Sequence, residues 1–148
     1  SLKRLVRELI RLRKAHAVFR RTDFLAGTQH PESQLKDVTW LAADGREMTE
    51  SDWHDSERQW LAVLLDRTRG AEQRARLEDA PAGDSFLVLF NASGRDLEFT
   101  LPSPITRQVW EVVFDTSQEA AAVPAAGYRK GHAYLLHRRS MALLADRG

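Results

Sequence analysis

An amphipathic pattern opens the chain. From Leu2 to about His16, apolar residues recur at the i, i+3, i+4, i+7 spacing that places them on one face of a helix. These residues are Leu2, Leu5, Val6, Leu9, Ile10 and Leu12. The other face carries a run of Lys and Arg that only Glu8 opposes, and Arg20 and Arg21 extend it. The pattern predicts one amphipathic helix with a basic flank.

Beyond residue 36 the pattern changes to short runs that are fully apolar or alternate with a period of two. Strands are predicted at 37–41, 60–65, 85–91, 97–101, 108–114, 133–137 and 141–145. Asp44-Gly45 predicts a tight turn, and Thr49 followed by acidic residues predicts one helical turn ending near Trp53. Asn91 to Gly94 predicts a hairpin that joins two adjacent strands, and 70–83 and 117–127 read as long loops.

Many short strands with no helix between most of them predict an antiparallel Greek-key β-sandwich. With its single preceding helix, the chain is all-β, or α+β by element count. We expect residues 1–22 to form the helical unit, 23–57 a connecting segment with short strands and a turn, and 58–148 the sandwich. A nucleotide-binding α/β fold is excluded, because no glycine-rich turn joins a strand to a helix.

The composition limits the kinds of ligand and binding site that the chain could have. The chain has 148 residues with 43% hydrophobic content, enough for one core, and a net charge of +1 that gives no overall case for nucleic acid or membrane binding. Without cysteine there are no disulfides or thiolate metal sites, and the five histidines show no metal spacing. We therefore expect no metal, no cofactor and a cytoplasmic location. The first residues also lack the apolar core of a signal peptide, which agrees with that location. The chain has no initiator Met and opens already inside a helical pattern, so we expect an excised piece of a longer protein.

One long stretch resembles a known family. Residues Lys36 to Asp55 resemble the "DVxWLxxDGxEMTxxDWxD" stretch of glycogen-debranching enzymes of the isoamylase type, in the α-amylase superfamily. Residues Leu9 to Arg21 are similar to the end of the last barrel helix of that superfamily, with Ala17 where the family usually has proline. The runs 86–91 and 110–116 are similar to the family's C-terminal sandwich.

The resemblance implies an enzyme that hydrolyses α-1,6 branch linkages in glycogen or limit dextrin. Such enzymes consist of an N-terminal β-domain, a (β/α)₈ barrel and a C-terminal sandwich, with their catalytic carboxylates on barrel loops. Residues 1–22 would be the last helix of that barrel. All catalytic carboxylates would precede this chain, so we expect no catalytic residue here and no activity of the fragment alone. Its implied partners are its own upstream barrel and, through the parent enzyme, a branched α-glucan.

Two clusters near the family motif are candidates for chemistry. The acids Asp37, Asp44, Glu47, Glu50, Asp52, Asp55 and Glu57 are crowded around a turn, and we expect them to be solvated and not a glycosidase pair. Trp53, His54 and Asp55 form a candidate glucan-binding triplet, because an indole stacks on sugar rings while His and Asp bond hydroxyl groups. Packing of Trp53 between domains is the favoured alternative. Trp40, Trp60 and Trp110 are expected in the core.

Two other function classes stay open at this point. The chain could be a stand-alone glycan-binding module, or its basic helix and sandwich could bind nucleic acid. The apolar stripe of the helix also needs a cover. Through Leu2, Leu5, Leu9 and Leu12, the helix is expected either to dock on the sandwich or to mediate self-association.

Overall fold

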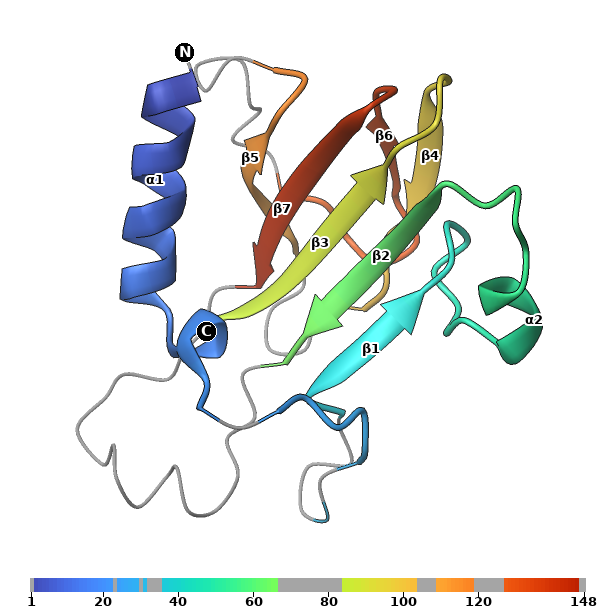
Figure 1. Cartoon of the computed structure of the whole chain (residues 1–148), viewed down its shortest axis with the longest axis horizontal. Helices are drawn as coiled ribbons and strands as arrows, with labels where there is room; N and C mark the ends of the chain where they lie inside the picture. Colours follow the sequence, from blue (N-terminus) through green and yellow to red (C-terminus); the bar gives the residue numbers. More distant parts are fainter. Residues whose placement is uncertain are drawn as a thin grey trace.

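The structure is a computed structural model that describes residues 2–22, 24–29, 31, 36–66, 84–103, 109–118 and 127–146 (Figure 1). Its helical segments are α1 (Leu2–Ala15), the 3-10 helix η1 (Ala17–Arg20) and α2 (Glu50–Trp53). Its strands are β1 (Val38–Leu41), β2 (Trp60–Leu65), β3 (Ser85–Asn91), β4 (Leu97–Thr100), β5 (Glu111–Asp115), β6 (Ala133–Leu136) and β7 (Ser140–Asp146). The predicted helix, the single helical turn and the predicted strands are confirmed. The predicted loop 70–83 and most of the loop 117–127 lie outside the described residues.

The strands form two sheets. A five-stranded antiparallel sheet has the order β1-β2-β3-β7-β5, and β4 pairs with β6 in a second, two-stranded sheet. A core of buried side chains lies between them: Leu41, Ala62, Leu87, Leu89, Phe99, Leu101, Trp110, Tyr134, Leu136, Ala142 and Leu144. The predicted sandwich preceded by a helix is confirmed. In the described part of the chain, no helix is long and apolar enough to cross a membrane.

The turn after β3 differs from the prediction. Strands β3 and β4 belong to different sheets, so the hairpin expected at Asn91 to Gly94 is wrong. The buried Asn91 side chain explains the difference: its Nδ2 donates to the carbonyl oxygens of Arg95 at 2.9 Å, Leu136 at 3.2 Å and His137 at 3.1 Å. These bonds tie the turn to the β6–β7 connection, so the chain crosses to the second sheet.

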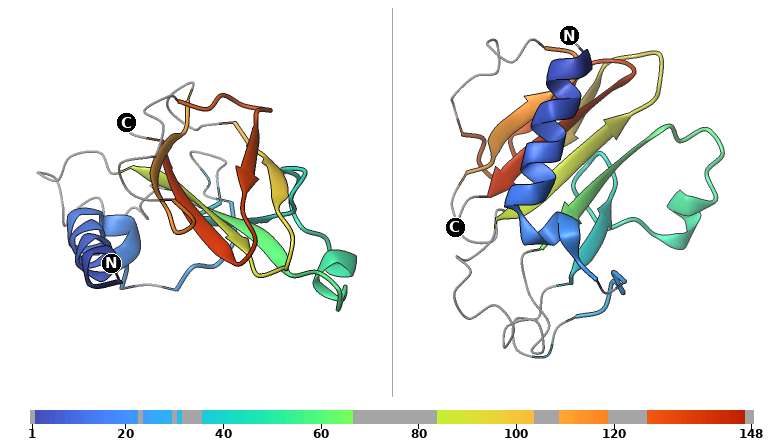
Figure 2. Two further views of the ribbon diagram at one scale, coloured as in Figure 1. Left: turned by 90° about the horizontal axis from the view of Figure 1, so that it is seen from above. Right: turned by 60° about the vertical axis from the view of Figure 1, so that its left-hand side comes forward.

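The outer face of the five-stranded sheet carries a second apolar cluster. Its buried members are Val38, Val63, Phe86, Val88, Leu143 and Ala145. The α1–η1 unit lies along this face (Figure 2), where Leu12, Val18 and Phe19 pack against the cluster. The rings of Phe19 and Phe86 have centroids 4.6 Å apart. The helix therefore contacts the sandwich through its last turn and η1, and no residue of α1 is fully buried.

Strand β1 lies within the predicted connecting segment 23–57. It pairs with β2 along its whole length, with Trp40 opposite Val63. The proposed division at residues 22 and 57 stays a prediction.

Candidate functional site

Thr49 is the N-cap of helix α2 and lies inside the stretch that carries the family resemblance. The backbone N–H of Thr49 donates to Asp52 Oδ2 at 2.8 Å, and its hydroxyl donates to the same oxygen at 2.9 Å. The N–H of Asp52 donates in return to the Thr49 carbonyl oxygen at 3.0 Å. This reciprocal arrangement fixes the start of a one-turn helix that would be marginal alone. Asp52 is thereby held in one position.

Two arginines converge on the Asp52 carboxylate. Arg46 Nη1 and Nη2 lie 2.5 and 2.9 Å from its two oxygens, and Arg58 Nη2 lies 2.6 Å from Oδ1. The hydrogen bonds from Arg46, followed by that from the Thr49 backbone, hold the pKa of Asp52 well below its usual range. Asp52 is buried, so the expectation that this acid is solvated is wrong. A carboxylate that stays ionised in this way cannot serve as a proton donor.

Asp37 has a similar anchoring role at the other end of the stretch. Burial raises its pKa, but hydrogen bonds from the backbone N–H groups of Ala26 (3.0 Å), Gly27 (2.8 Å) and Val38 (2.8 Å) outweigh that effect. With Arg21 at 3.6 Å adding to them, the net pKa of Asp37 is lowered. Asp37 therefore connects the segment after η1 to the start of β1.

The turn between these anchors reaches across the sandwich. Gly45 adopts a φ of 84°, as the Asp-Gly turn signal predicts. Two residues earlier, the Ala43 carbonyl oxygen accepts a hydrogen bond of 2.7 Å from the N–H of Thr100 at the end of β4. Residues 37–55 thus join the edge of one sheet to the edge of the other.

Two tryptophans lie at the surface, Trp53 at the end of α2 and Trp40 on β1. Trp53 is 51% exposed and Trp40 is 41% exposed, and their rings meet edge to face with centroids 5.5 Å apart at 76°. The expectation that Trp40 is a core residue is therefore wrong, whereas Trp110 is fully buried as expected. The pairing of Trp40 with Trp53 was missed because the two residues belong to different elements, separated by the turn.

The other two residues of the candidate triplet are exposed and make local contacts. His54 Nδ1 lies 2.8 Å from the Glu50 carbonyl oxygen. Asp55 Oδ1 accepts the N–H of Glu57 at 3.1 Å, and its Oδ2 lies 3.9 Å from Arg58 Nε. The exposed surface of α2 therefore combines an aromatic pair with hydrogen-bonding groups. Glucan binding by Trp53, His54 and Asp55 stays a prediction.

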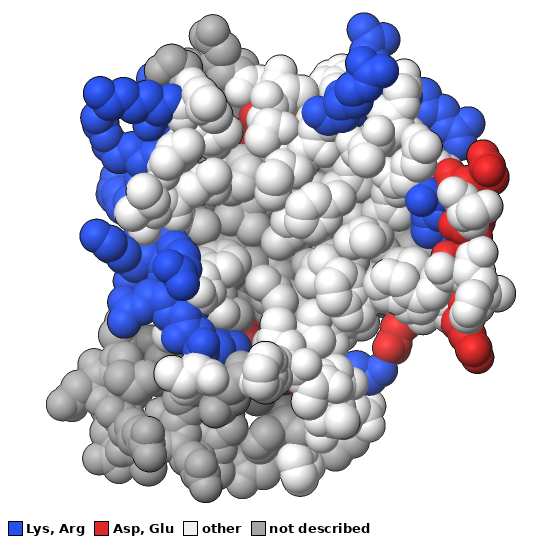
Figure 3. Space-filling view, in the orientation of Figure 1, with Lys and Arg blue, Asp and Glu red and all other residues white. Residues whose placement is uncertain are grey.

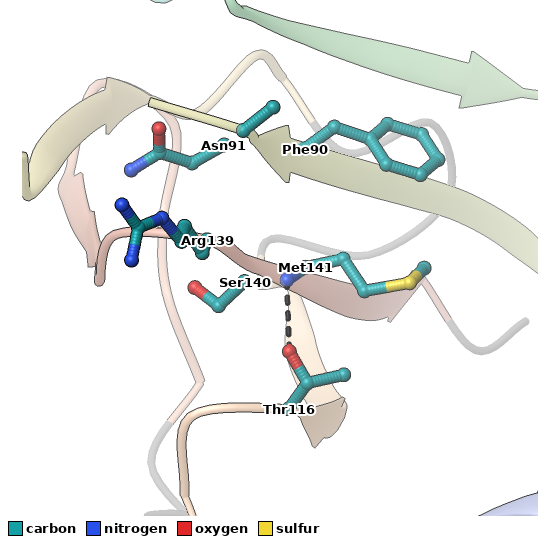
Figure 4. Close-up of a pocket in the computed structure, with 7 residues that line it drawn as sticks. Phe90, Asn91, Thr116, Arg139, Ser140 and Met141 are labelled. Carbon is teal, nitrogen blue, oxygen red and sulfur yellow. Dashed lines mark hydrogen bonds between the residues drawn. The ribbon is translucent and has the colours of Figure 1, made fainter. Parts of the chain in front are cut away.

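An open hollow lies elsewhere, where β3 ends and β7 begins (Figure 4). It is lined by Phe90, Asn91, Ala92, Thr116, Arg139, Ser140 and Met141. Figure 4 shows Phe90 and Met141 side by side, with the Met141 N–H donating to Thr116 Oγ1 at 2.9 Å. The lining has no carboxylate, so the hollow lacks the acid pair that glycoside hydrolysis requires. Within the described ranges, no group of three or more His, Cys, Asp or Glu could hold a metal ion.

Comparison with known proteins decides the family. The sequence model described as "Isoamylase, C-terminal" matches residues 37–145, which is most of the chain. The chain belongs to the isoamylase C-terminal family. This isoamylase C-terminal domain is also 38% identical over 112 residues to proteins named "Glycogen operon protein GlgX homolog" from Mycobacterium bovis and from two strains of Mycobacterium tuberculosis. That match covers 75% of this chain but only 15% of each relative, so the chain spans a small part of their length. The resemblance seen in the sequence is confirmed.

The anchoring carboxylates predict how the stability of this isoamylase C-terminal domain depends on pH. A third carboxylate, Asp96, accepts a hydrogen bond from the Arg138 backbone N–H at 2.9 Å and lies 3.0 Å from His137 Nδ1, and these contacts lower its pKa. Asp52, Asp37 and Asp96 all have lowered pKa values, so each contributes stability above the ordinary value of 3.8 and loses it as pH falls toward the folded-state pKa. We expect Tm to fall below about pH 4. Thermal unfolding followed by circular dichroism between pH 7 and pH 3 measures this effect.

The variant Asp52→Asn isolates the contribution of the Asp52 charge to stability, because it keeps the shape of the side chain and removes its charge. Its Tm should lie below that of the wild type at pH 7, and the gap should close as pH falls. Ser51→Ala on the same helix removes no titrating group, so its gap should not depend on pH. A gap for Asp52→Asn that is constant with pH contradicts the anchoring role.

Proposed function

We propose that this chain is the C-terminal accessory domain of an enzyme that hydrolyses α-1,6-glucosidic branch linkages in glycogen or limit dextrin. The isoamylase C-terminal match over residues 37–145 carries the proposal. The relatives' name, which refers to a glycogen operon, supports the substrate class. Membership in this family also favours an accessory domain over a stand-alone glycan-binding or nucleic-acid-binding module.

The chemistry is assigned to the part of the longer protein that precedes this chain. Among the acids near the family motif, the Asp52 carboxylate is engaged by two arginines, and the Asp37 carboxylate accepts hydrogen bonds from three backbone N–H groups. Neither is available as a nucleophile or as an acid catalyst. We propose that residues 1–22 complete the upstream catalytic barrel, and that the enzyme acts in the cytoplasm, consistent with a chain that lacks cysteine.

A reducing-end assay on a branched glucan tests the proposal. The longer protein that carries this chain should release reducing ends, and the isolated chain should release none. Release by the isolated chain that Asp55→Asn abolishes would show that the chain has its own active site. No release by the folded longer protein would refute the debranching activity.

A direct glucan contact by the domain is a second candidate role. The exposed edge-to-face pair of Trp40 and Trp53 favours it, because exposed aromatic faces stack on sugar rings and His54 and Asp55 offer hydrogen-bonding groups nearby. In this role the domain would hold a glucan chain near the enzyme without acting on it.

The variant Trp53→Ala in the longer enzyme tests this role. Loss of one stacked ring should weaken glycogen binding by about twofold to twelvefold, if the contact contributes as much as an aromatic pair, about 0.5–1.5 kcal/mol. Affinity electrophoresis in glycogen measures the change, with Leu135→Ala as a control that removes an exposed apolar side chain from the other sheet. Unchanged glycogen binding together with a lower Tm would assign Trp53 to packing.

A further inference from the structure

Charges of opposite sign gather on opposite sides of the domain. Figure 3 shows Lys and Arg side chains along the side that α1 occupies, and Asp and Glu side chains around α2 on the other side. The net charge of the whole chain is only +1, so this separation comes from the arrangement of the charges and not from an excess of one sign. A glucan is neutral, so contact with a glucan does not account for either charged surface.

The basic surface is a stripe along α1. At 3.6 residues per turn, five basic positions fall within about 100° around the helix axis and extend about 17 Å along it. These exposed residues, which we call the basic stripe, are Lys3, Arg4, Arg7, Arg11 and Lys14. The half-buried residues Leu5, Leu9 and Leu12 lie on the opposite side of the helix, where Leu12 packs on the sandwich. The basic stripe therefore points away from the sandwich.

The basic stripe is hardly neutralised within the described part of the chain. Among the described residues its one ion pair joins Arg11 Nη1 to Glu8 Oε2 at 3.7 Å, and both side chains are more than half exposed. An exposed pair of this kind contributes little to stability. Five positive charges on one side of a helix repel one another, so carboxylates placed opposite the stripe would be attracted to it.

The acidic surface surrounds helix α2. Its exposed carboxylates, which we call the acidic rim, are those of Asp44, Glu47, Glu50, Asp55 and Glu57. The buried Asp52 engages both nearby arginines, Arg46 and Arg58, so these offset the charge of the rim only in part. Arg46 also contacts Asp44, and Lys36 contacts Glu47, whereas the described residues provide no ion pair for Glu50 or Glu57. The acidic rim therefore keeps a net negative charge.

The basic stripe and the acidic rim cannot meet within one molecule, because α1 and α2 lie on opposite sides of the sandwich (Figure 1). In two molecules they can. A polyanion such as a nucleic acid would be attracted by the stripe but repelled by the rim, and the chain as a whole offers it almost no net charge. A second copy of the same chain is the partner whose charges match both surfaces.

We infer that the basic stripe of one molecule docks on the acidic rim of a second copy. The two surfaces differ, so the contact is head-to-tail, and a molecule in the chain of contacts can bind one neighbour through each surface. This contact differs from the predicted self-association through Leu2, Leu5, Leu9 and Leu12, which lie on another side of α1. Exposed ion pairs are weak one by one and are screened by salt, so the association is weak and salt-dependent.

Sedimentation velocity of the longer protein that carries this chain tests the inference. The Debye length is about 30 Å at about 0.01 M salt and about 3 Å at about 1 M, so the contact is screened only at the higher concentration. We expect the weight-average mass at the lower salt concentration to be at least about twice the mass at the higher one.

Charge reversal identifies the two surfaces. The double variant Arg7→Glu/Arg11→Glu reverses the stripe, and Glu50→Lys/Glu57→Lys reverses the rim. At low salt each variant alone should keep the mass that it has at high salt, because like charges then face one another. An equimolar mixture of the two should associate again, since each surface then finds its opposite. If the rim variant fails to fold, Glu57→Lys alone replaces it, because Glu57 lies outside α2.

Arg129→Glu/Lys130→Glu is the matched control, since it makes the same change in net charge at exposed residues that precede β6. This control should associate like the wild type. Circular dichroism checks that every variant is folded. A wild-type mass that does not depend on salt overturns the inference, and so does association that either reversed variant retains. Loss of association in the control as well would assign the effect to net charge and would also overturn it, as would a mixture that stays dissociated.

Discussion

Replacing Trp110 with alanine is expected to lower the free energy of unfolding by about 3–5 kcal/mol. Trp110 is fully buried between the two sheets, so its removal leaves a large cavity that its neighbours cannot fill. Its indole N–H donates to the Pro102 carbonyl oxygen at 2.9 Å, and the variant also leaves that oxygen without this donor. A loss of this size is a large fraction of the stability of an ordinary domain.

Denaturant unfolding followed by fluorescence or circular dichroism measures the loss. Trp53→Ala is the matched control: it removes the same side chain from a site where half of it is exposed, and we expect it to cost less than half as much. Trp110→Phe keeps most of the apolar volume, so its loss of unfolding free energy should lie between the losses of Trp110→Ala and Trp53→Ala. Equal losses at positions 110 and 53 would show that Trp110 does not anchor the core.

Gly45→Ala is expected to cost about 2–4 kcal/mol, from two sources that add. The φ of 84° at Gly45 is unfavourable for a residue with a side chain. An added Cβ would also lie 2.8 Å from the Thr100 carbonyl oxygen, which belongs to backbone and cannot rotate away. The turn that joins the two sheets must therefore shift, and the hydrogen bond between Ala43 and Thr100 weakens.

Gly94→Ala is the control for this substitution. Gly94 has no atom within 4 Å of the position that its Cβ would take, and its φ is not positive. We expect a change within about 0.5 kcal/mol. Thermal unfolding of both variants measures the two changes in stability. If Gly45→Ala is as stable as Gly94→Ala, the turn at Gly45 does not stabilise the domain.

The elements of the fold could be predicted from the sequence because each one is encoded locally. The apolar spacing from Leu2 to Leu12 fixes a helical face, and runs such as 60–65 and 85–91 are too short and too apolar for anything but buried strands. The sheet to which each strand belongs was not predictable in this way. The turn signal at Asn91 to Gly94 suits a hairpin, but distant carbonyl groups at Leu136 and His137 decide where the chain goes.

The candidate site could likewise be predicted only in part, where the residues themselves indicate their role. The triplet at Trp53 was identified because its residue types suggest sugar contact. The roles of Asp52 and Trp40 depend on partners in other elements. Arg46 and Arg58 each stand six residues from Asp52, outside the spacing at which helical neighbours pair. Nothing in the local pattern therefore indicates that this acid is buried and bonded to both arginines.

The strand order of the five-stranded sheet affects how the domain folds during its synthesis. Strand β7 comes after every other described strand in the sequence, yet it lies between β3 and β5 and pairs with both. While the chain emerges from the ribosome, β3 has only β2 as a partner in its sheet and β5 has none there until residues 140–146 arrive. The apolar edge of β3 is exposed for that interval. Folding must therefore wait for the last strand, which makes translation of the C-terminal residues the step at which this domain is most exposed to aggregation.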